Sequence, residues 1–197
     1  MSYILNLETS SKNCSVSLFK GDKIVNIIEK QDDGYRHSEL LTSFIHQILS
    51  KEKIGVENLS AVSVAKGPGS FTGLRIGLSV AKGLCFPYNT PIIGINSLEI
   101  LALSHKPEKD EHILSLIQDK NNSFYSMLLD SNHNEVEKPS IVLIDENFLK
   151  KYENINSLVI VSNTKSIKEI IDFGSIKIYV NNISAKHMGN MSKENFD

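Results

Sequence analysis

The apolar and polar positions of the first hundred residues follow two different spacings. Short apolar runs bounded by turn residues predict strands, and apolar residues spaced three or four apart predict helices. The predicted strands are Tyr3–Glu8, Cys14–Phe19, Lys23–Glu29, Ala61–Lys66 and Pro91–Ile95. The predicted helices are Ser38–Glu52, Gly73–Phe86 and Ser97–Ser104. This order predicts an α/β fold, in which a three-strand antiparallel meander is continued by parallel strand–helix units.

The residues that lead into the first predicted helix include a histidine, a serine and a glutamate in a row. We expect Ser38 to be the N-cap of this helix, with Glu39 in the positive field of its first turn. His37, Ser38 and Glu39 are residue types of a hydrolase triad, but neighbours on a helix do not face one another. We therefore interpret His37 as a residue at the start of the helix.

The second half of the chain predicts a smaller α/β domain. The polar segment Lys106–Glu111 is the expected boundary, which gives domains at residues 1–105 and 106–197. Apolar runs predict strands at Ile113–Gln118, Phe124–Leu129, Leu158–Val161 and Ile176–Val180. Helical spacing predicts helices at Asp145–Tyr152, Lys165–Phe173 and Ser184–Glu194. We expect the last helix to pack back on the first domain.

A glycine-rich loop joins the fourth predicted strand to the second helix. Because unpaired N–H groups at the start of a helix favour anions, the loop is a candidate phosphate or nucleotide site. The candidate residues are Gly67, Pro68, Gly69, Ser70, Thr72 and Gly73. The loop lacks the Gly-Lys-Ser/Thr ending of a P-loop, and Thr72 replaces the third glycine of a dinucleotide fingerprint. The alternative is a tight turn in which Ser70 or Thr72 caps the helix.

Small residues recur along the helix that follows this loop. Gly73, Gly77 and Ala81 are four residues apart, so one stripe of the helix is nearly bare backbone. Glycine inside a helix costs about 1 kcal/mol relative to alanine. Close approach of a second helix, from this chain or from a partner, would offset that cost.

The bulk composition argues against several classes of function. The net charge of −2 gives no general attraction to nucleic acid or to an anionic membrane. Arg36 and Arg75 are the only arginines among 21 basic residues, which argues against direct reading of RNA. No apolar run approaches membrane-spanning length, and Tyr3–Glu8 is too short for a signal peptide. We therefore expect a cytoplasmic protein.

Residues that could carry chemistry are few. Cys14 and Cys85 have no paired motif and lie in apolar patterns, so we expect both to be core residues. The six histidines form no His-x-x-x-His pair. Glu8 ends the first predicted strand, a position typical of site residues on open α/β sheets. Because no second carboxylate converges on it, we predict no catalytic residue, no metal site and no required cofactor.

Several segments in the first half match one family in their order and spacing. They are Tyr3-Ile-Leu-Asn-Leu-Glu-Thr-Ser10, Cys14-Ser-Val-Ser-Leu18, His37-Ser-Glu-Leu-Leu41, Gly67-Pro-Gly-Ser-Phe-Thr-Gly-Leu-Arg-Ile-Gly77, Ala81-Lys-Gly-Leu84 and Pro91-Ile-Ile-Gly-Ile-Asn-Ser-Leu98. Together they resemble the bacterial TsaB family, also called YeaZ. The resemblance is close over the first half and loose over the second.

The resemblance implies an actin-like ATPase (ASKHA) fold made of two ribonuclease-H-like lobes with mixed sheets. It also implies a part in making threonylcarbamoyladenosine (t6A) beside the anticodon of tRNAs. In this family TsaB is the non-catalytic scaffold subunit, which forms a heterodimer with TsaD, a metal-binding catalytic paralogue. The ATPase TsaE joins that pair, and tRNA is met only through the complex.

Departures from the family pattern bear on chemistry. In the paralogue, the segment matching Ile95–Leu101 carries a histidine pair that holds the metal, whereas this chain has Ser97 and Leu101. Serine is a poor ligand and leucine is none, so we expect neither a metal site nor glycoprotease-like hydrolysis. Glu8 replaces the aspartate common at its position. The family's usual C-terminal Glu-Pro-x-Tyr-Leu-Arg/Lys segment is absent, so we expect its contribution to be missing or replaced.

The resemblance places both long helices of the first domain at the subunit interface, where helices of the two partners form a four-helix arrangement. We expect apolar residues of the first helix to pack across it and the small stripe of the second to allow close approach. The expected interface residues are Leu41, Phe44, Ile45, Ile48, Gly73, Arg75, Ile76, Gly77, Val80, Ala81 and Leu84. The alternative is that these faces cover only this chain's own sheet.

Two other functions remain as alternatives. An autonomous ATPase or phosphotransferase would need a carboxylate pair for magnesium and a second phosphate loop, and neither is visible. A homodimeric module would differ from the scaffold subunit only in its partner. A homodimer is left open as the state of the chain alone.

Overall fold

The computed structural model describes residues 2–31 and 36–196 and divides the chain into two compact units. Unit 1 combines the chain up to Ile100 with the segment from Ile183 onward, and unit 2 is Leu101–Asn182. The chain first passes from unit 1 to unit 2 between Ile100 and Leu101, close to the boundary predicted after residue 105. The sequence prediction assigned residues 106–197 to the second domain and expected the last helix to pack back on the first, and the segment from Ile183 onward belongs to unit 1.

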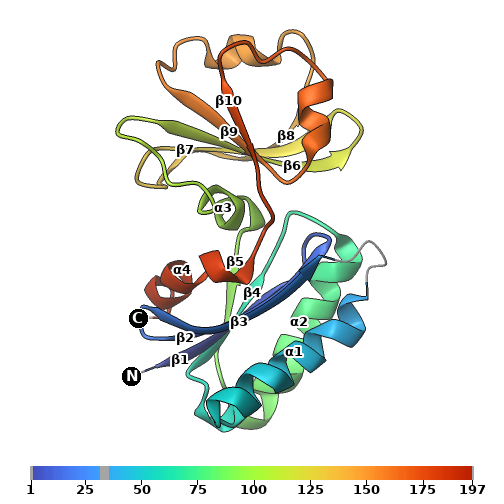
Figure 1. Ribbon diagram of the computed structural model, residues 1–197, viewed down its shortest axis with the longest axis vertical. Helices are drawn as coiled ribbons and strands as arrows, with labels where there is room; N and C mark the ends of the chain where they lie inside the picture. Colours follow the sequence, from blue (N-terminus) through green and yellow to red (C-terminus); the bar gives the residue numbers. More distant parts are fainter. Residues whose placement is uncertain (1, 32–35, 197) are drawn as a thin grey trace. The chain divides into compact units, whose positions relative to one another are not determined.

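Unit 1 is built on a five-stranded mixed sheet with the strand order β3-β2-β1-β4-β5 (Figure 1). Its strands are β1 (Tyr3–Glu8), β2 (Asn13–Lys20), β3 (Lys23–Gln31), β4 (Ala61–Ala65) and β5 (Ile92–Ile95). The first three pair antiparallel, and β4 and β5 extend the sheet parallel to β1. The predicted meander continued by parallel units is confirmed.

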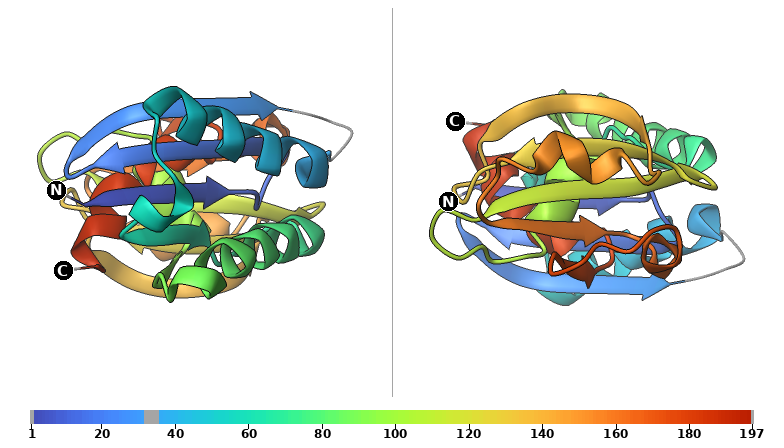
Figure 2. Two further views of the ribbon diagram at one scale, coloured as in Figure 1. Left: turned by 90° about the horizontal axis from the view of Figure 1, so that it is seen from below. Right: turned by 90° about the horizontal axis from the view of Figure 1, so that it is seen from above.

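The helices α1 and α2 cover one face of this sheet (Figures 1 and 2). The helix α3 (Ser97–Ala102) spans the point where the chain passes into unit 2. The helical elements wholly within unit 1 before that point are α1 (His37–Glu52), α2 (Phe71–Cys85) and the 3₁₀ turns Val56–Asn58 and Phe86–Tyr88. Their apolar residues pack on Leu5, Leu7 and Val16 of the sheet. The predicted N-cap at Ser38 is wrong, because α1 begins at His37 and Arg36 precedes it without a side-chain cap. Cys14 and Cys85 are buried and free, as predicted.

The other face of the sheet in unit 1 is polar, yet it is buried. Asn6, Ser15 and Ser17 are each 0% exposed. Residues 183–194, which we call the return segment, lie over this face and contain the 3₁₀ turn Ala185–His187 and the helix α4 (Gly189–Glu194). Hydrogen bonds join Asn6, Ser15 and Ser17 to the return segment, so the polar alternation of β1 and β2 serves an internal contact rather than solvent.

The return segment is held along its whole length. At its start, Asn13 Nδ2 donates to the carbonyl oxygen of Ile183 (2.9 Å). In its middle, Ser17 Oγ donates to the carbonyl oxygen of Ala185 (2.7 Å). Near its end, Ser192 Oγ donates to Asn6 Oδ1 (2.5 Å). The segment is therefore an integral layer of unit 1.

Unit 2 has the same strand topology as unit 1, with the order β10-β9-β6-β7-β8. Its strands are β6 (His112–Lys120), β7 (Ser123–Leu129), β8 (Glu135–Leu143), β9 (Leu158–Ser162) and β10 (Lys177–Val180). The first three again form an antiparallel meander, and β9 and β10 run parallel to β6. The sequence did not predict β8, because Pro139 and several charged residues interrupt its apolar pattern.

The crossovers of unit 2 are shorter than predicted. The helices expected at Asp145–Tyr152 and Lys165–Phe173 are the 3₁₀ turns Phe148–Tyr152 and Lys165–Glu169. Apolar residues from both turns close a separate core over the sheet. Its buried members are Leu114, Leu116, Phe124, Leu128, Ile144, Phe148, Tyr152, Ile160, Ile167 and Phe173.

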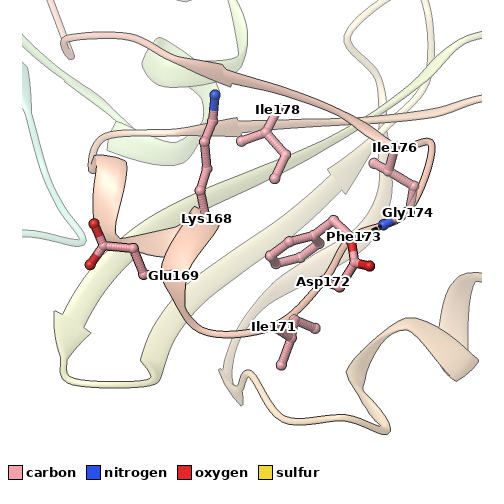
Figure 3. A pocket seen from close by; sticks show the side chains of 8 residues that line it. All are labelled: Lys168, Glu169, Ile171, Asp172, Phe173, Gly174, Ile176 and Ile178. Carbon is pink, nitrogen blue, oxygen red and sulfur yellow. Dashed lines mark hydrogen bonds between the residues drawn. The ribbon is translucent and has the colours of Figure 1, made fainter.

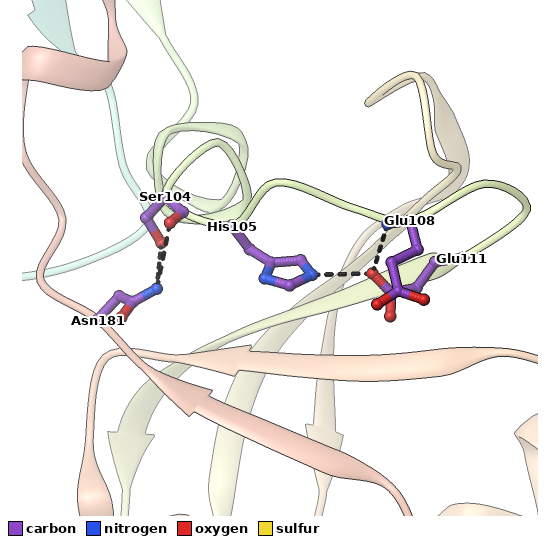
Figure 4. Close-up of polar contacts among 5 residues, drawn as sticks. All are labelled: Ser104, His105, Glu108, Glu111 and Asn181. Atoms are coloured by element: carbon purple, nitrogen blue, oxygen red, sulfur yellow. Dashed lines mark hydrogen bonds and ion pairs between the residues drawn. The ribbon is translucent and has the colours of Figure 1, made fainter.

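The segments that enter and leave unit 2 are tied together inside it (Figure 4). Asn181 Nδ2 donates to Ser104 Oγ (2.9 Å). The His105 ring lies against Tyr179 with 4.4 Å between ring centroids, and its Nε2 is 2.8 Å from Glu111 Oε2. These contacts fix the two ends of unit 2 beside each other.

Candidate functional site

The glycine-rich loop between β4 and α2 packs on the turn that follows β1. Gly69 has a φ of +150°, and a Cβ atom there would lie 2.4 Å from the carbonyl oxygen of Ser10. A side chain is therefore excluded at this position. Ser70 caps α2, because its Oγ accepts a hydrogen bond from Gly73 N (3.3 Å). The predicted cap at Ser70 is confirmed, whereas Thr72 lies inside the helix.

The chain itself uses backbone donors at the start of α2. Ser70 N donates to the carbonyl oxygen of Ser10 (2.7 Å), and Gly73 N donates to Ser70 Oγ. These two N–H groups are therefore already bonded where an anion would need them. A nucleotide at this loop stays a prediction. Among the described residues, no group of histidine, cysteine and acidic side chains could hold a metal ion.

Glu8 ends β1 beside this loop, and its side chain is completely buried. Ser10 donates to Glu8 Oε1 through its backbone N (2.7 Å) and through its hydroxyl. The second oxygen, Oε2, has no hydrogen-bond partner among the described residues. Burial raises the pKa of Glu8 to about 7, against the opposing effect of the hydrogen bonds from Ser10 and Ser11. The carboxyl group therefore changes its charge near neutral pH.

The turn after β1 also occupies the bare stripe of α2. Thr9 Oγ1 donates to the carbonyl oxygen of Gly73 (2.8 Å). A Cβ at Gly73 would lie 2.0 Å from Thr9 O, and one at Gly77 would lie 2.5 Å from Thr9 Oγ1. Ala81 is buried in the same core. The chain's own turn therefore fills the space beside Gly73 and Gly77, so these two glycines need no partner helix to explain them, and the approach of a partner helix to this stripe stays a prediction.

Most of the other predicted interface residues also lie in the interior of unit 1. Leu41, Phe44, Ile45 and Ile48 of α1 are between 0% and 7% exposed and belong to the core of this unit. The alternative, that these residues cover the chain's own sheet, holds for them. Ile76, Val80 and Leu84 of α2 are half-buried at the edge of the core, and Arg75 is exposed.

The outward side of α2 presents a different apolar surface. Phe71 and Leu78 are 66% and 40% exposed, and Phe86 in the following 3₁₀ turn is 88% exposed. The Arg75 guanidinium lies 3.8 Å from the Phe71 ring centroid, and Lys82 is exposed on the same side. We call Phe71, Arg75, Leu78, Lys82 and Phe86 the α2 face, because residues three or four apart share one side of a helix.

Sequence reasoning missed most of the α2 face because it followed the small residues. Gly73, Gly77 and Ala81 mark the buried side of α2. The large apolar residues on the opposite side were the available signal. Of the interface residues predicted from the sequence, Arg75 belongs to the α2 face.

Unit 2 contains a shallow hollow of about 640 Å³ beside β10 (Figure 3). Phe173, Ile176 and Ile178 supply apolar lining, and Lys168 and Asp172 lie at its margin. The polar residues that line it are exposed to solvent. We assign no chemistry to this hollow.

The shared topology of the two units defines the class of protein. Each unit is a ribonuclease-H-like sheet, and two such units in one chain form an actin-like ATPase fold. The family model described as "TsaD: tRNA N6-adenosine threonylcarbamoyltransferase" matches residues 26–180. The tRNA threonylcarbamoyladenosine biosynthesis protein TsaB of Buchnera aphidicola subsp. Acyrthosiphon pisum is 30% identical over 177 residues, which cover 88% of this chain and 78% of the relative. The chain belongs to the TsaB family, also called YeaZ.

Two further comparisons agree with this assignment. TsaB of Buchnera aphidicola subsp. Baizongia pistaciae is 31% identical over 162 residues, covering 79% of this chain and 70% of the relative. The structure of YeaZ from Pseudomonas aeruginosa has the same fold, with a TM-score of 0.81 at 18% identity over 100% of this chain and 92% of that one. No helix in the described residues is long and apolar enough to cross a membrane.

Proposed function

We propose that this chain is the non-catalytic scaffold subunit of the machinery that makes threonylcarbamoyladenosine in tRNA. Its TsaB relatives are named tRNA threonylcarbamoyladenosine biosynthesis proteins, which supports the same pathway here. Ser97 and Leu101 of α3 are both fully buried, and neither side chain offers the imidazole ligand that a catalytic paralogue would need. This supports a role other than catalysis.

The α2 face carries the scaffold proposal. A group of large apolar side chains exposed on one side of a helix is typical of a protein-binding surface. The exposed side of α1 is polar by contrast, with Thr42, Ser43 and Gln47 facing outward. The partner therefore contacts α2 more than α1. The partner is a TsaD-type paralogue, which a TsaE-type ATPase then joins. The tRNA binds to the assembled complex in the cytoplasm rather than to this chain alone.

The charge of the α2 face indicates the chemistry of the partner surface. Arg75 and Lys82 lie among the apolar residues, and α2 contains no acidic residue. The partner surface that fits is apolar with carboxylates at its margin, since opposite charges across an interface favour the correct partner.

A single charged substitution on the α2 face tests the scaffold proposal. Leu78→Asp places a carboxylate in the centre of the apolar surface, and we expect the Kd for a TsaD-type partner to rise on the order of 10- to 100-fold. The matched control is Thr42→Asp on the exposed side of α1, for which we expect a change of less than about 2-fold. Calorimetric titration of each variant with the partner measures both constants.

Reconstituted tRNA modification gives the functional test. We expect TsaD-type and TsaE-type proteins to modify tRNA with the wild-type chain and to lose that activity when the chain is omitted. Leu78→Asp should restore less activity than Thr42→Asp at equal concentration. Equal binding by the two variants, or full modification without the chain, contradicts the proposal.

A further inference from the structure

The buried Glu8 carboxyl holds the turn on which α2 begins. Its Oε1 atom accepts hydrogen bonds from the backbone N (2.7 Å) and the hydroxyl of Ser10. The carbonyl oxygen of Ser10 in turn accepts from Ser70 N (2.7 Å), and Ser70 is the N-cap of α2. A short chain of hydrogen bonds therefore links one buried carboxyl to the residue where the helix starts.

The same turn also contacts the first turns of both long helices. Thr9 Oγ1 donates to the carbonyl oxygen of Gly73 (2.8 Å), and His37 Nε2 is 2.7 Å from the carbonyl oxygen of Ser11. The turn packs tightly against α2, because a Cβ atom at Gly73 would lie 2.0 Å from Thr9 O. A displacement of the turn must therefore displace the start of α2, where the α2 face begins at Phe71.

We propose that Glu8 is a positioning residue for the α2 face, because its carboxyl fixes the turn Thr9–Ser11 and loss of its proton loosens that turn together with the first turn of α2. The part that concerns partner binding rests on the proposed function. The part that concerns the turn concerns this chain alone.

The groups around the carboxyl leave its charge uncompensated. From the turn itself, Ser10 and Ser11 contribute hydrogen bonds and no charge. From β2, burial and the nearby Glu8 raise the pKa of Cys14 to about 12, so the thiol is neutral at physiological pH. From α1, His37 Nε2 lies 2.7 Å from the carbonyl oxygen of Ser11.

The charged groups on β3 and the return segment interact with one another. Glu29 accepts from Ser15, which pairs with Glu8 across β1 and β2. Despite partial burial, hydrogen bonds from Ser184 and Asn13 together with the charge of Lys186 lower the pKa of Glu29, so it is ionised. Burial and Lys186 lower the pKa of His187 to about 4, so its ring is neutral near pH 7. Among the described residues, no cation contributes to the raised pKa of Glu8, which burial dominates.

The difference in the pKa of Glu8 between the closed and the open turn determines how opening of the turn depends on pH. The pKa of Glu8 is about 7 in the closed turn, and a carboxyl hydrated in an open turn returns to its ordinary value of 4.5. As the pH rises through this window, the open form loses its proton first, so opening becomes more favourable. The opening constant rises about 80-fold between pH 4.5 and 7, and it approaches a total rise of about 300-fold only well above pH 7 relative to well below pH 4.5.

Amide hydrogen exchange in the isolated chain tests the turn. We expect the protection of the Ser10 and Ser70 amides to fall by up to about 70-fold between pH 5 and pH 8, after correction for the intrinsic exchange rate. Glu8→Gln keeps an acceptor for Ser10 but does not titrate, so its profile should be flat. The amides of Leu116 and Ile160 in unit 2 are the internal reference. The proposal is overturned if amide protection in the wild type does not change with pH, or if it changes equally in Glu8→Gln. If Glu8→Gln fails to fold, the pH dependence of protection in the wild type decides alone.

Partner affinity tests the link to the α2 face. We expect the ratio of the wild-type Kd to the Glu8→Gln Kd for a TsaD-type partner to rise at least about threefold from pH 5.5 to pH 8. An unchanged ratio with pH-dependent exchange overturns the positioning role. Leu78→Asp distinguishes failure of the positioning role from failure of the proposed scaffold function. If Leu78→Asp binds the partner as tightly as the wild type at both pH values, the proposed scaffold function fails. The exchange profile still tests the effect of Glu8 on the turn in that case.

Discussion

At the scale of single residues, two glycines of α2 occupy opposite surroundings. A Cβ at Gly73 would lie 2.0 Å from Thr9 O, whereas a Cβ at Gly83 would meet no atom within 4 Å. Gly73 is buried and Gly83 is exposed on the same helix. Alanine is favoured over glycine by about 1 kcal/mol in a helix. A Gly73→Ala substitution can therefore lower the free energy of unfolding only through the close contact with Thr9.

The same substitution at the two glycines should therefore have opposite effects. We expect Gly73→Ala to lower the free energy of unfolding by about 2 kcal/mol, because the turn after β1 must move. We expect Gly83→Ala to raise it by up to about 1 kcal/mol. Urea unfolding followed by circular dichroism measures both values. A stabilised Gly73→Ala variant would contradict the contact between Gly73 and Thr9.

The sequence could predict the small stripe but not the residue that fills it. Regular spacing of Gly73, Gly77 and Ala81 predicts a close approach, and a close approach exists. Thr9, however, lies 64 residues from Gly73, and no periodicity connects the two positions. The capping role of Ser70 was predictable because it depends on residues within one helical turn.

At the scale of elements, the polar face of the sheet in unit 1 shows what a local pattern leaves undetermined. Alternating polar residues on antiparallel strands usually face water. Here the return segment covers them and supplies their hydrogen-bond partners. The sequence predicted that the last helix packs on the first domain, but it did not predict that this contact is polar.

One hydroxyl of α4 tests the return segment as a layer of unit 1. Ser192→Ala removes the donor to Asn6 Oδ1 and leaves a buried oxygen unpaired, which should lower the free energy of unfolding by about 1–3 kcal/mol. Asn190 is exposed on the same helix, so Asn190→Ala should change it by less than about 0.5 kcal/mol. Chemical unfolding of both variants gives the comparison. Equal values would show that the contact with Asn6 contributes no net stability.

The elements of unit 2 were harder to predict than those of unit 1. Its predicted helices span few residues, and over so short a stretch the same apolar residues fit a 3₁₀ turn. The strand β8 escaped prediction because Pro139 and charged side chains are tolerated at the edge of a sheet. In unit 1 the longer helices repeat their pattern over several turns, and there the prediction succeeded.

At the scale of the whole molecule, the two units differ in continuity along the chain. Unit 2 is one uninterrupted segment, Leu101–Asn182, with its own core. Unit 1 is completed by residues from both sides of unit 2. Apart from the expected contact of the last helix, no pattern in the sequence indicates this difference.

This difference predicts how fragments behave. We expect residues 101–182 to unfold cooperatively as a fragment, because their core is complete. We expect residues 1–100 alone to lack cooperative unfolding, because the polar face of their sheet loses the return segment. Joining residues 1–100 to residues 183–197 by a short linker should restore it. Thermal unfolding by circular dichroism tests all three, and cooperative unfolding of residues 1–100 alone would contradict the prediction.

The return segment also has a consequence during synthesis on the ribosome. Asn6 emerges 186 residues before Ser192, its partner in the folded chain. At typical translation speeds this interval is about 10 to 40 s. We expect unit 2, although it is synthesised later, to finish folding first. Until the return segment has been synthesised, the serine and asparagine side chains of the N-terminal sheet remain hydrated.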